Sequence, residues 1–336
     1  MENKNRIIIS RTDAIGDVIL TLPMCGWIKK NIPDAYIIFL GQKYTSPIIS
    51  CSKYVDEVIE WDHQTEGDAG KQVSLLSSLN ADIIIHVFPK SAIAKAAKKA
   101  KIPFRIGTSG RLYHYLTCNK LLKFSRKKSD LHEGQLNFKL LSPLGFNGTI
   151  ETTELNSLYG FNSSYELNKE ITDLIDKSKF NIILHPKSKG SAREWGITNF
   201  VELMNLLPQD KYKIFVSGTE DEGKLIKANT TLPSHVIDIT GKLSLNEFIS
   251  FINHCDGLIA ASTGPLHIAA ALQKVAIGIY PPIRPMHPGR WAPIGSKASF
   301  LVKEKECNTC RKEGACQCML SISPQEVFEK LDSLNK

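Results

Sequence analysis

Three clusters of polar residues follow apolar runs that are typical of β-strands, and their residue types suit two kinds of chemistry. The cluster at 11–23 (RTDAIGDVILTLP) carries Asp13 and Asp17, and a carboxylate can accept a proton from a hydroxyl group. The clusters at 185–203 (HPKSKGSAREWGITNFVEL) and 262–267 (STGPLH) combine hydroxyls, glycines and basic side chains, which are groups that bind phosphate. The chain therefore carries candidates for a general base and for two phosphate-binding loops.

The third cluster has the sequence of a strand, a tight turn and a helix start. Ser262 or Thr263 can cap the helix, and Pro265 suits a first helical position. Gly264 lets a ligand approach the backbone closely, and the unpaired N–H groups of a first helical turn favour a bound phosphate. His267 could reach the same anion. The alternatives are an ordinary strand-to-helix connection that binds nothing and a histidine that only packs.

Two interpretations fit the aspartates of the first cluster. Either Asp13 or Asp17 could cap the helix that follows the opening strand. Asp17, at the start of that helical stretch, is also placed where the helix dipole favours a carboxylate, and it could act as a general base. Spacing alone does not choose between the two aspartates.

The second cluster concentrates hydrogen-bond donors and positive charge in one loop. The residues that supply them are Lys187, Ser188, Lys189, Gly190, Ser191 and Arg193. Because arginine can bind phosphate oxygens bidentately, such a loop needs no metal to neutralise a pyrophosphate. The order of Gly, Lys and Ser does not match a Walker A loop, and no Gly-x-Gly-x-x-Gly occurs anywhere in the chain.

The net charge of +8 is concentrated in the first half of the chain. The segments 90–105 and 119–128 bring eleven lysines and arginines with few acids. They could form an ordinary solvated surface, or they could bind a phosphorylated acceptor, an anionic membrane surface or nucleic acid. Nucleic acid is disfavoured because interleaved aromatic residues and familiar binding modules are missing.

Strand-like and helix-like segments alternate along the whole chain, which has 336 residues and 42% hydrophobic content, too many for one ordinary core. The expected strands are 6–10, 36–40, 55–59, 82–87 and 104–107, then 181–184, 213–216, 236–239, 258–261 and 275–279, with helices such as 24–31 and 92–100. Continuous Ile and Val runs predict parallel strands covered on both faces. We therefore expect an α/β fold of two doubly wound, Rossmann-like domains facing each other across a cleft, with ligands at the carboxyl ends of the strands.

Changes in local amino-acid composition along the chain suggest where the domains end. The predicted parts are an amino-terminal domain at 1–155, a linker at 156–178, a carboxyl-terminal domain at 179–320 and a closing helix at 321–336. The linker region is rich in Asn, Ser, Thr and Gly, and the closing helix has Ser323 as its expected cap and Pro324 at its first position.

Composition also bears on the cellular compartment. No apolar run reaches the ~18 residues needed to cross a bilayer, and the first residues do not resemble a secretory signal, so we expect a soluble, cytoplasmic protein. Eight cysteines in such a protein favour reduced thiols or one metal cluster over disulfides. Cys307, Cys310, Cys316 and Cys318 form the one candidate for a zinc site, although their C-x-C end is tighter than usual. Reduced thiols or a disulfide are the alternatives there.

Four sequence motifs occur in an order that is typical of one protein family. They are IGDVILTLP, HPKSKGSAREW, STGPLHIAAAL and RPMHPGRWAPIG, and together the chain resembles glycosyltransferase family 9, the ADP-heptose:lipopolysaccharide heptosyltransferases. The resemblance spans most of the chain. It implies a GT-B fold and an inverting, metal-independent transfer of a heptose or related sugar from a nucleotide diphosphate donor, without a cofactor. The acceptor implied is a core oligosaccharide on lipid A.

The resemblance also assigns roles to residues. It places the catalytic base on Asp17 and a basic residue that balances charge on the departing diphosphate on Arg193. The implied donor contacts are Ser188, Lys189, Glu222, Ser262, Thr263, Gly264 and His267, with Glu222 facing the nucleoside. Many relatives have Asp at the position of Ser262, so the nature of the donor sugar stays open, and ADP-heptose is the expected donor rather than a certain one.

The basic first half then has a candidate purpose. Arg105, Arg111, Lys120 and Lys123 are the expected contacts to a phosphorylated lipid A–core acceptor, although each could equally be a solvated surface residue. We expect peripheral contact with the inner face of the inner membrane and no binding of nucleic acid. Two rival functions remain, a nucleotide-sugar epimerase of the same fold and a non-enzymatic module that binds anionic lipid or polymer.

Overall fold

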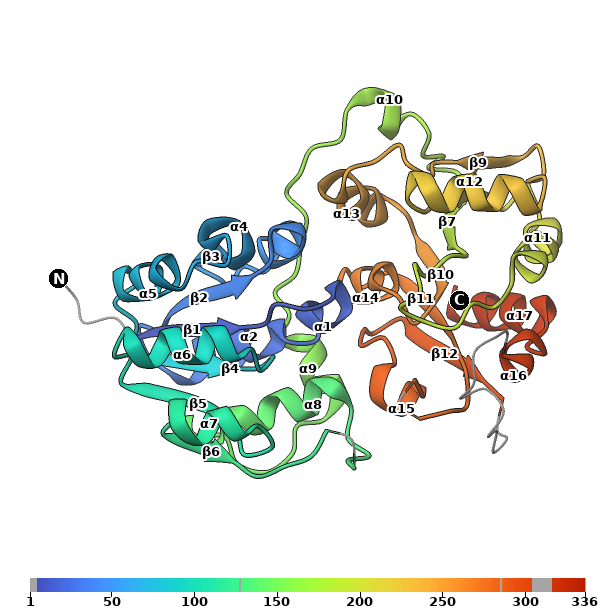
Figure 1. Cartoon of the computed structure of the whole chain (residues 1–336). Helices are drawn as coiled ribbons and strands as arrows, with labels where there is room; N and C mark the ends of the chain where they lie inside the picture. Colours follow the sequence, from blue (N-terminus) through green and yellow to red (C-terminus); the bar gives the residue numbers. More distant parts are fainter. Residues whose placement is uncertain (1–4, 127, 285, 304–315, 336) are drawn as a thin grey trace. The chain divides into compact units, whose positions relative to one another are not determined.

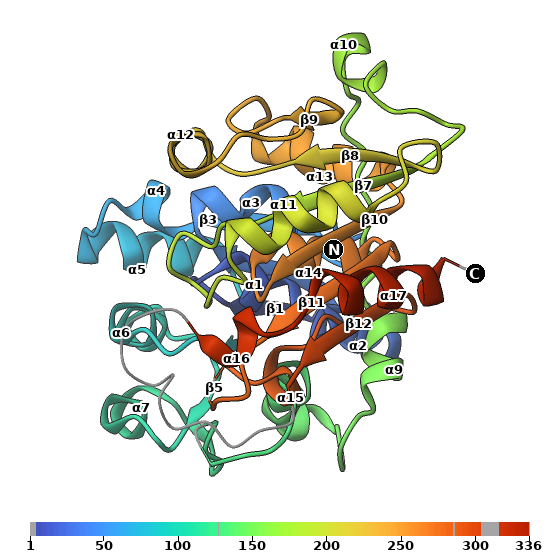
Figure 2. The same cartoon turned by 90° about the vertical axis from the view of Figure 1, so that its right-hand side faces the viewer.

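Runs of isoleucine and valine form the central strands of two parallel sheets in the computed structural model, which describes residues 5–126, 128–284, 286–303 and 316–335 (Figures 1 and 2). The chain divides into two compact units, Met1–Asn162 and Ser163–Lys336. The division falls inside the segment 156–178 that the sequence marks as a linker. Each unit contains one six-stranded sheet.

The first unit alternates strands and helices. Its strands are β1 (Arg6–Ser10), β2 (Tyr36–Gly41), β3 (Glu57–Glu60), β4 (Ile83–His86), β5 (Phe104–Thr108) and β6 (Lys120–Leu122). Its helices are α1 (Ile15–Ile19), α2 (Leu22–Asn31), η1 (Lys43–Thr45), α3 (Ser46–Ile49), α4 (Trp61–Thr65), α5 (Ala69–Ser78), α6 (Ser91–Lys99), α7 (Leu112–Thr117), α8 (Glu133–Phe138), η2 (Lys139–Leu144) and α9 (Thr152–Ser157). The strand order is β3-β2-β1-β4-β5-β6, so the order reverses between β1 and β4. We call this position the first switch point.

Alternation of buried side chains explains the layers of the first unit. Ile8, Ile38 and Ile84, on neighbouring parallel strands, face one side and pack with Leu76 of α5 and Ile93 of α6. The intervening residues of these strands are also buried and face the other side. Both faces of the sheet are therefore covered, as parallel sheets require.

The second unit repeats the plan. Its strands are β7 (Phe180–His185), β8 (Tyr212–Val216), β9 (Val236–Asp238), β10 (Gly257–Ala261), β11 (Val275–Tyr280) and β12 (Ala298–Val302). Its helices are α10 (Lys169–Thr172), α11 (Ile197–Leu206), α12 (Glu220–Asn229), α13 (Leu245–His254), α14 (Gly264–Ala271), α15 (Pro288–Trp291), α16 (Gln317–Leu320) and α17 (Pro324–Leu334). The order β12-β11-β10-β7-β8-β9 reverses between β7 and β10, which is the second switch point.

Helices cover both faces of the second sheet. Phe200 of α11 and Val327 of α17 belong to the core on one face, whereas Phe251 of α13 stacks edge-on against Phe215 of β8 on the other. Trp195, fully buried, donates from Nε1 to the carbonyl of Ile322 at 2.8 Å and so joins the segment before α11 to the segment before α17. The last helix has the expected Ser323 cap, whose hydroxyl accepts from the Glu326 N–H.

The doubly wound α/β architecture predicted from the sequence is confirmed for both units. Each of the ten expected strands is present, with ends that differ by two residues or fewer. Two edge strands were not expected. β6 is only three residues long and begins with a lysine, and β12 carries a serine and a partly exposed pattern, so neither has the apolar run that marks a central strand.

Candidate active site

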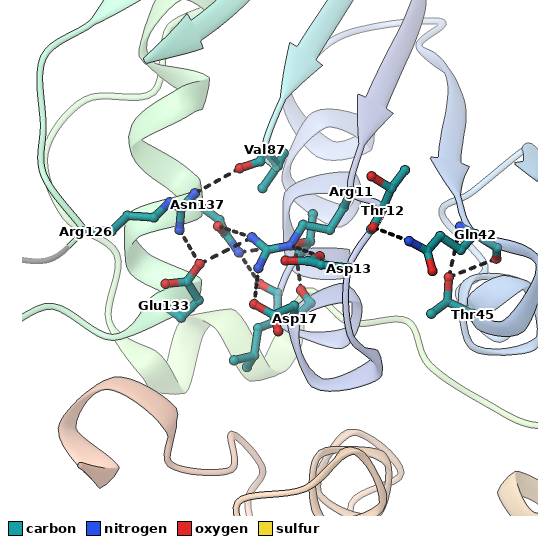
Figure 3. A network of polar contacts seen from close by, with 12 residues as sticks. Arg11, Thr12, Asp13, Asp17, Gln42, Thr45, Val87, Arg126, Glu133 and Asn137 are labelled. Carbon is teal, nitrogen blue, oxygen red and sulfur yellow. Dashed lines mark hydrogen bonds and ion pairs between the residues drawn. The ribbon is translucent and has the colours of Figure 1, made fainter. Parts of the chain in front are cut away.

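The first switch point is built around a buried arginine (Figure 3). Arg11 directly follows β1, and its guanidinium donates from Nε to Asp13 Oδ1 at 2.7 Å and from Nη2 to Asp17 Oδ1. Its Nη1 reaches Glu133 Oε1 at 3.3 Å. Three carboxylates from two distant parts of the sequence therefore meet one positive charge at the carboxyl edge of the sheet.

A second arginine completes this group. Glu133 is the first residue of α8, where His132 is the N-cap, and it is almost fully buried. Arg126 pairs with the same Glu133 oxygen and donates to the carbonyl of Val87, just after β4, at 3.4 Å. We call Arg11, Asp13, Asp17, Arg126 and Glu133 the carboxylate–arginine network. It contains three carboxylates and two guanidiniums, so an excess of negative charge remains.

Burial of this network shifts the pKa values of its members. Burial raises the pKa of Asp17 to about 6, with Arg11 opposing the rise and the charges of Asp13 and Glu133 adding to it. Burial also raises the pKa of Asp13, again against Arg11. For Arg11 itself, burial acts to lower the pKa, but the carboxylates outweigh it and the pKa is raised. A carboxylate with a pKa near 6 is ionised at neutral pH and more basic than an ordinary aspartate, as a general base should be.

The interpretation of the aspartates as helix caps is wrong. The N-cap of α1 is Ala14, and no side chain caps this helix. Asp17 lies in its first turn, with Oδ1 facing Arg11, and within the part of the chain that the structure describes no hydrogen bond reaches Oδ2. Both Asp13 and Asp17 remain partly exposed, so the geometry leaves either able to receive a proton.

Backbone contacts hold the loop that carries these aspartates. The Tyr44 hydroxyl donates to the Asp13 carbonyl at 2.7 Å, and Gln42 Nε2 donates to the Thr12 carbonyl at 2.6 Å. On the other side, the Thr21 hydroxyl donates to the Asp17 carbonyl at 2.8 Å. The base candidates therefore sit on a loop that is fixed at several points (Figure 3).

The second switch point brings together the two predicted phosphate-binding segments. The loop after β7 begins at Pro186, and the turn after β10 is Ser262–Thr263; the two strands are direct parallel neighbours. Because carboxyl ends of adjacent parallel strands meet at one edge, 186–196 and 262–267 lie at the same edge of the second sheet. The sequence predicts this juxtaposition, and the strand pairing produces it.

The loop after β7 is closed by a tight turn. Lys189 and Gly190 have φ values of 48° and 78°, and the Ser191 N–H donates to the Ser188 carbonyl at 2.9 Å, an arrangement typical of a type I′ turn. Glycine tolerates this conformation at no steric cost, whereas a lysine does so less readily. The turn fixes the backbone around the residues expected to bind phosphate.

A carboxylate of the chain occupies several of the donors in this loop. Glu194 accepts from the Ser188 N–H at 3.1 Å and pairs with Lys187 Nζ at 2.8 Å. The Ser188 hydroxyl lies 2.9 Å from the Ala192 carbonyl and 3.3 Å from Glu194 Oε1. The loop therefore already holds one anion, the Glu194 side chain, where a phosphate was expected. Arg193 is partly buried beside it.

The turn after β10 contains a buried hydroxyl at the start of a helix. Thr263 is the N-cap of α14, but its side chain makes no capping hydrogen bond, and Oγ1 is buried without a partner among the described residues. Pro265 occupies the expected first turn. Ser262 is not the cap, because Thr263 holds the N-cap position, and His267 is buried within the helix. A buried, unpartnered hydroxyl at a helix N-terminus suits a phosphate oxygen.

Glu222 has a structural role that the sequence analysis did not predict. It is the third residue of α12, where its Oε2 accepts from the Thr219 N–H at 2.8 Å and from the Thr219 hydroxyl at 3.0 Å in a capping box. Nearby, burial lowers the pKa of His185 to about 4 against the charges of Glu222 and Glu194, so this histidine is neutral at pH 7. His185 bonds the Ser217 hydroxyl through Nδ1 at 2.9 Å.

The four expected acceptor contacts do not form one group. Arg111 caps α7 after β5, and Lys123 follows β6, so both lie at the carboxyl edge of the first sheet. Lys120 reaches instead over the ring of Phe104, 5.8 Å from its centroid, towards the amino end of β5. Arg105 donates to the carbonyls of Thr117 and Ile102, among others. The guanidinium of Arg105 therefore links β5 to its neighbouring turns.

The described residues contain neither a candidate metal cluster nor a helix that could span a membrane. No group of three or more His, Cys, Asp or Glu side chains there could hold a metal ion. Cys307 and Cys310 lie outside the described residues, so the zinc hypothesis for the four cysteines is untested; Cys316 is buried at the start of α16. No described helix has the length and hydropathy to span a membrane.

Each of the two units has a doubly wound α/β architecture, and comparison with known proteins identifies the family. The sequence profile of glycosyltransferase family 9 (heptosyltransferase) matches residues 74–319. A putative glycosyltransferase of Haemophilus influenzae is 25% identical over 298 residues, which cover 86% of each chain.

Two solved structures resemble this chain over almost its whole length. A family 9 glycosyl transferase from Veillonella parvula superposes with a TM-score of 0.84 at 19% identity, over 99% of this chain and 98% of that one. ADP-heptose lipopolysaccharide heptosyltransferase II of Escherichia coli superposes with a TM-score of 0.76 at 19% identity, over 98% of both chains. This chain belongs to glycosyltransferase family 9. Its fold is of the GT-B type, as predicted.

The sequence reasoning missed four side chains of the first site, namely Arg11, Arg126, Glu133 and Asn137. Asn137 accepts from Arg11 Nη1 through Oδ1 at 3.4 Å. The sequence did contain a signal for Arg11. This arginine directly follows the buried run Ile7–Ser10 of β1, so its side chain begins in a buried position. No spacing rule links it to α8, since more than a hundred residues separate them.

Proposed function

We propose that this protein transfers a heptose from a nucleotide diphosphate donor, ADP-heptose in the first instance, to a lipopolysaccharide core acceptor, with inversion at the anomeric carbon and without a metal ion. Family membership supports glycosyl transfer, and the name of the similar Escherichia coli enzyme supports this donor. The observation that carries the mechanism is Asp17, held by Arg11 at the first switch point with a pKa raised to about 6.

In the proposed reaction Asp17 is the general base. The acceptor hydroxyl gives its proton to Asp17 as its oxygen attacks the anomeric carbon. The new carbon–oxygen bond forms on the face opposite the bond to the diphosphate, which breaks with its electron pair staying on the phosphate oxygen. A single displacement of this kind inverts the configuration and needs no covalent intermediate.

The second switch point would hold the donor and its leaving group. The Thr263 hydroxyl and the first-turn N–H groups of α14 are suited to one phosphate. Arg193 and Lys189 would balance the charge that develops on the departing diphosphate, together with Ser188. Gly264 and His267 belong to the same turn. We place Ser262 and Glu222 at the periphery of the proposed donor site.

Two basic residues of the first unit would bind the acceptor. Arg111 and Lys123, both exposed at the carboxyl edge of the first sheet, are suited to its phosphates. Because a lipid carries this acceptor, we further propose that the protein works at the cytoplasmic face of the inner membrane as a peripheral protein.

The direct test incubates the purified full-length protein with ADP-heptose and a core acceptor that lacks its heptose, in the presence of EDTA. We expect ADP release, a product heavier by one heptose in mass spectrometry, and the inverted anomeric configuration by NMR. Epimerised donor without transfer would favour the epimerase. Acceptor binding with no affinity for ADP would favour the non-enzymatic module. Activity that requires an added metal would remove the metal-independent mechanism.

A further inference from the structure

Helix α7 turns large apolar side chains towards solvent. Leu112 is 87% exposed, Leu116 73% and Tyr115 58%. Their spacing of three and four residues places them on one face of the helix. Isolated exposed hydrophobic residues are common on protein surfaces, but three on one short helix form a patch that is typical of an interaction site.

The helix does not depend on these side chains for its position. Its opposite face buries His114, whose Nδ1 lies 2.9 Å from the Thr108 carbonyl oxygen, and Thr117. A neighbouring helix also holds α7, because Lys98 of α6 donates from Nζ to the Leu116 carbonyl at 2.7 Å. Figures 1 and 2 both show α6 beside α7 at the β5–β6 end of the first sheet. The exposed residues are therefore displayed by a helix that is fixed from its other sides.

Positive charge surrounds the patch. Between Asp82 and Asp130 the sequence has twelve lysines and arginines and no acidic residue. Three of the exposed ones, Lys95, Lys98 and Lys99, lie on α6. Arg111 stands at the start of α7, and at the amino end of β5 the half-exposed ring of Phe104 lies under the ammonium of Lys120. Cations of α6 and the start of α7 therefore lie beside the exposed leucine and tyrosine residues.

We propose that α7 and α6 form a docking surface for an anionic lipid bilayer. We call it the α6–α7 surface. Leucine and tyrosine side chains are suited to the boundary between headgroups and acyl chains, and lysines on the border are attracted by acidic headgroups. Within the run 83–129 no carboxylate offsets this attraction. Long lysine stems can also lie along apolar surface while their charges stay in the headgroup layer.

This surface specifies the membrane contact included in the proposed function, and it rests on that part of the proposal alone. The chemistry of the site is separate from it. The binding experiment below uses neither donor nor acceptor, so its failure would remove the docking surface and leave the transferase mechanism standing. Failure of the transferase assay would leave the docking surface unaffected.

The test measures sedimentation of the full-length protein with vesicles of phosphatidylcholine alone and of phosphatidylcholine with phosphatidylglycerol. We expect binding to the mixed vesicles that weakens as salt is raised, and much weaker binding to neutral vesicles. Leu112→Ser with Leu116→Ser should weaken binding about tenfold or more. Lys95→Gln with Lys99→Gln should weaken it by a similar factor and reduce the salt dependence, while Lys98, which anchors α7, is left in place.

Matched controls keep the test falsifiable. Leu225→Ser replaces a leucine that is 54% exposed on α12, whose first turn is acidic, and should leave vesicle binding unchanged. Thermal unfolding should show that all variants fold. Equal binding to neutral and anionic vesicles, or unchanged binding in both double variants, overturns the proposal. So does a wild-type dimer that the Leu112→Ser/Leu116→Ser variant dissociates, since the patch would then be covered by a second copy.

Discussion

The two switch points share one topology but contain opposite chemistry. In each unit the order of parallel strands reverses beside the first strand, and the loops after the two central strands meet there. At the first switch point the segment after β1 and the start of α8 bring carboxylates around Arg11, with a net excess of negative charge. At the second switch point the loops bring lysines, hydroxyls and a helix N-terminus. The scaffold therefore fixes where a site forms, and the few residues after each strand decide what it does.

The two sites also differ in how firmly they are held. Arg11 is buried, and several hydrogen bonds fix its partners, so the carboxylate–arginine network is preorganised. The pair of Lys187 and Glu194 is more exposed and lies in a loop that is closed by a single turn. A general base must be positioned accurately relative to the hydroxyl that it deprotonates. A loop that binds and releases a diphosphate must instead be able to exchange its hydrogen-bond partners.

The largest expected effect comes from the first site. Asp17→Asn keeps the shape of the side chain but removes the proton acceptor, so kcat should fall by about 10²- to 10⁴-fold with the affinity for ADP nearly unchanged. Because the pKa of Asp17 is higher than its ordinary value, ionisation of this group at pH 7 disfavours the folded state, and the neutral asparagine should not lower Tm. Steady-state kinetics, ADP titration calorimetry and thermal unfolding check the three parts.

Asp13→Asn is the matched control for this variant. Asp13 pairs with the same arginine and is equally exposed, so the two substitutions perturb the network in similar ways. A larger loss of kcat in Asp13→Asn than in Asp17→Asn would move the base assignment to Asp13. Normal turnover in both variants would exclude the first switch point as the source of the base.

The second site should respond in binding as well as in rate. Arg193→Ala removes a charge that we assign to the leaving diphosphate, so KM for the donor should rise and kcat should fall, together by about 10- to 100-fold in kcat/KM. Arg111→Ala, in the other unit, is a charge-matched control and should leave ADP affinity unchanged. If both variants bind ADP as the unaltered protein does, Arg193 has no role in holding the diphosphate.

How much the sequence predicts differs between the fold and the sites. The central strands follow from uninterrupted runs such as those at Ile7 and Ile182, and the second switch point follows from Thr263 and Pro265, because both signals are local. The edge strands β6 and β12 lack such runs and were missed.

Contacts between distant segments explain the rest. Nothing near Arg11 indicates that Glu133 will approach it, because this contact depends on how α8 returns to the sheet. In the same way, the composition of the loop after β7 indicates phosphate binding but not that Glu194 will pair with Ser188 and Lys187. Residue types at strand ends are therefore predictable, whereas their partners depend on the tertiary fold.

The pH dependence gives a finer test of the first site. With the pKa of Asp17 raised to about 6, kcat/KM should rise between pH 5 and pH 7 and level off above, because the base must be deprotonated. Glu133→Gln removes a negative charge that raises this pKa, so the rising limb should move to lower pH. A pH–rate series on both proteins measures the shift. Glu133 acts through its neighbours, so a loss of activity with an unmoved pH limb would indicate a structural role alone.

The smallest expected effect distinguishes two roles for Glu194. Its carboxylate now accepts from the Ser188 N–H and pairs with Lys187, which are groups that a bound diphosphate would also use. If the carboxylate competes with the diphosphate, Glu194→Gln should bind ADP about twofold to fivefold more tightly, the scale of a partly exposed ion pair. Titration calorimetry measures the change, with Glu202→Gln on α11 as a control that should have none. Weaker binding by Glu194→Gln would mean that this carboxylate shapes the loop for the donor and does not compete with it.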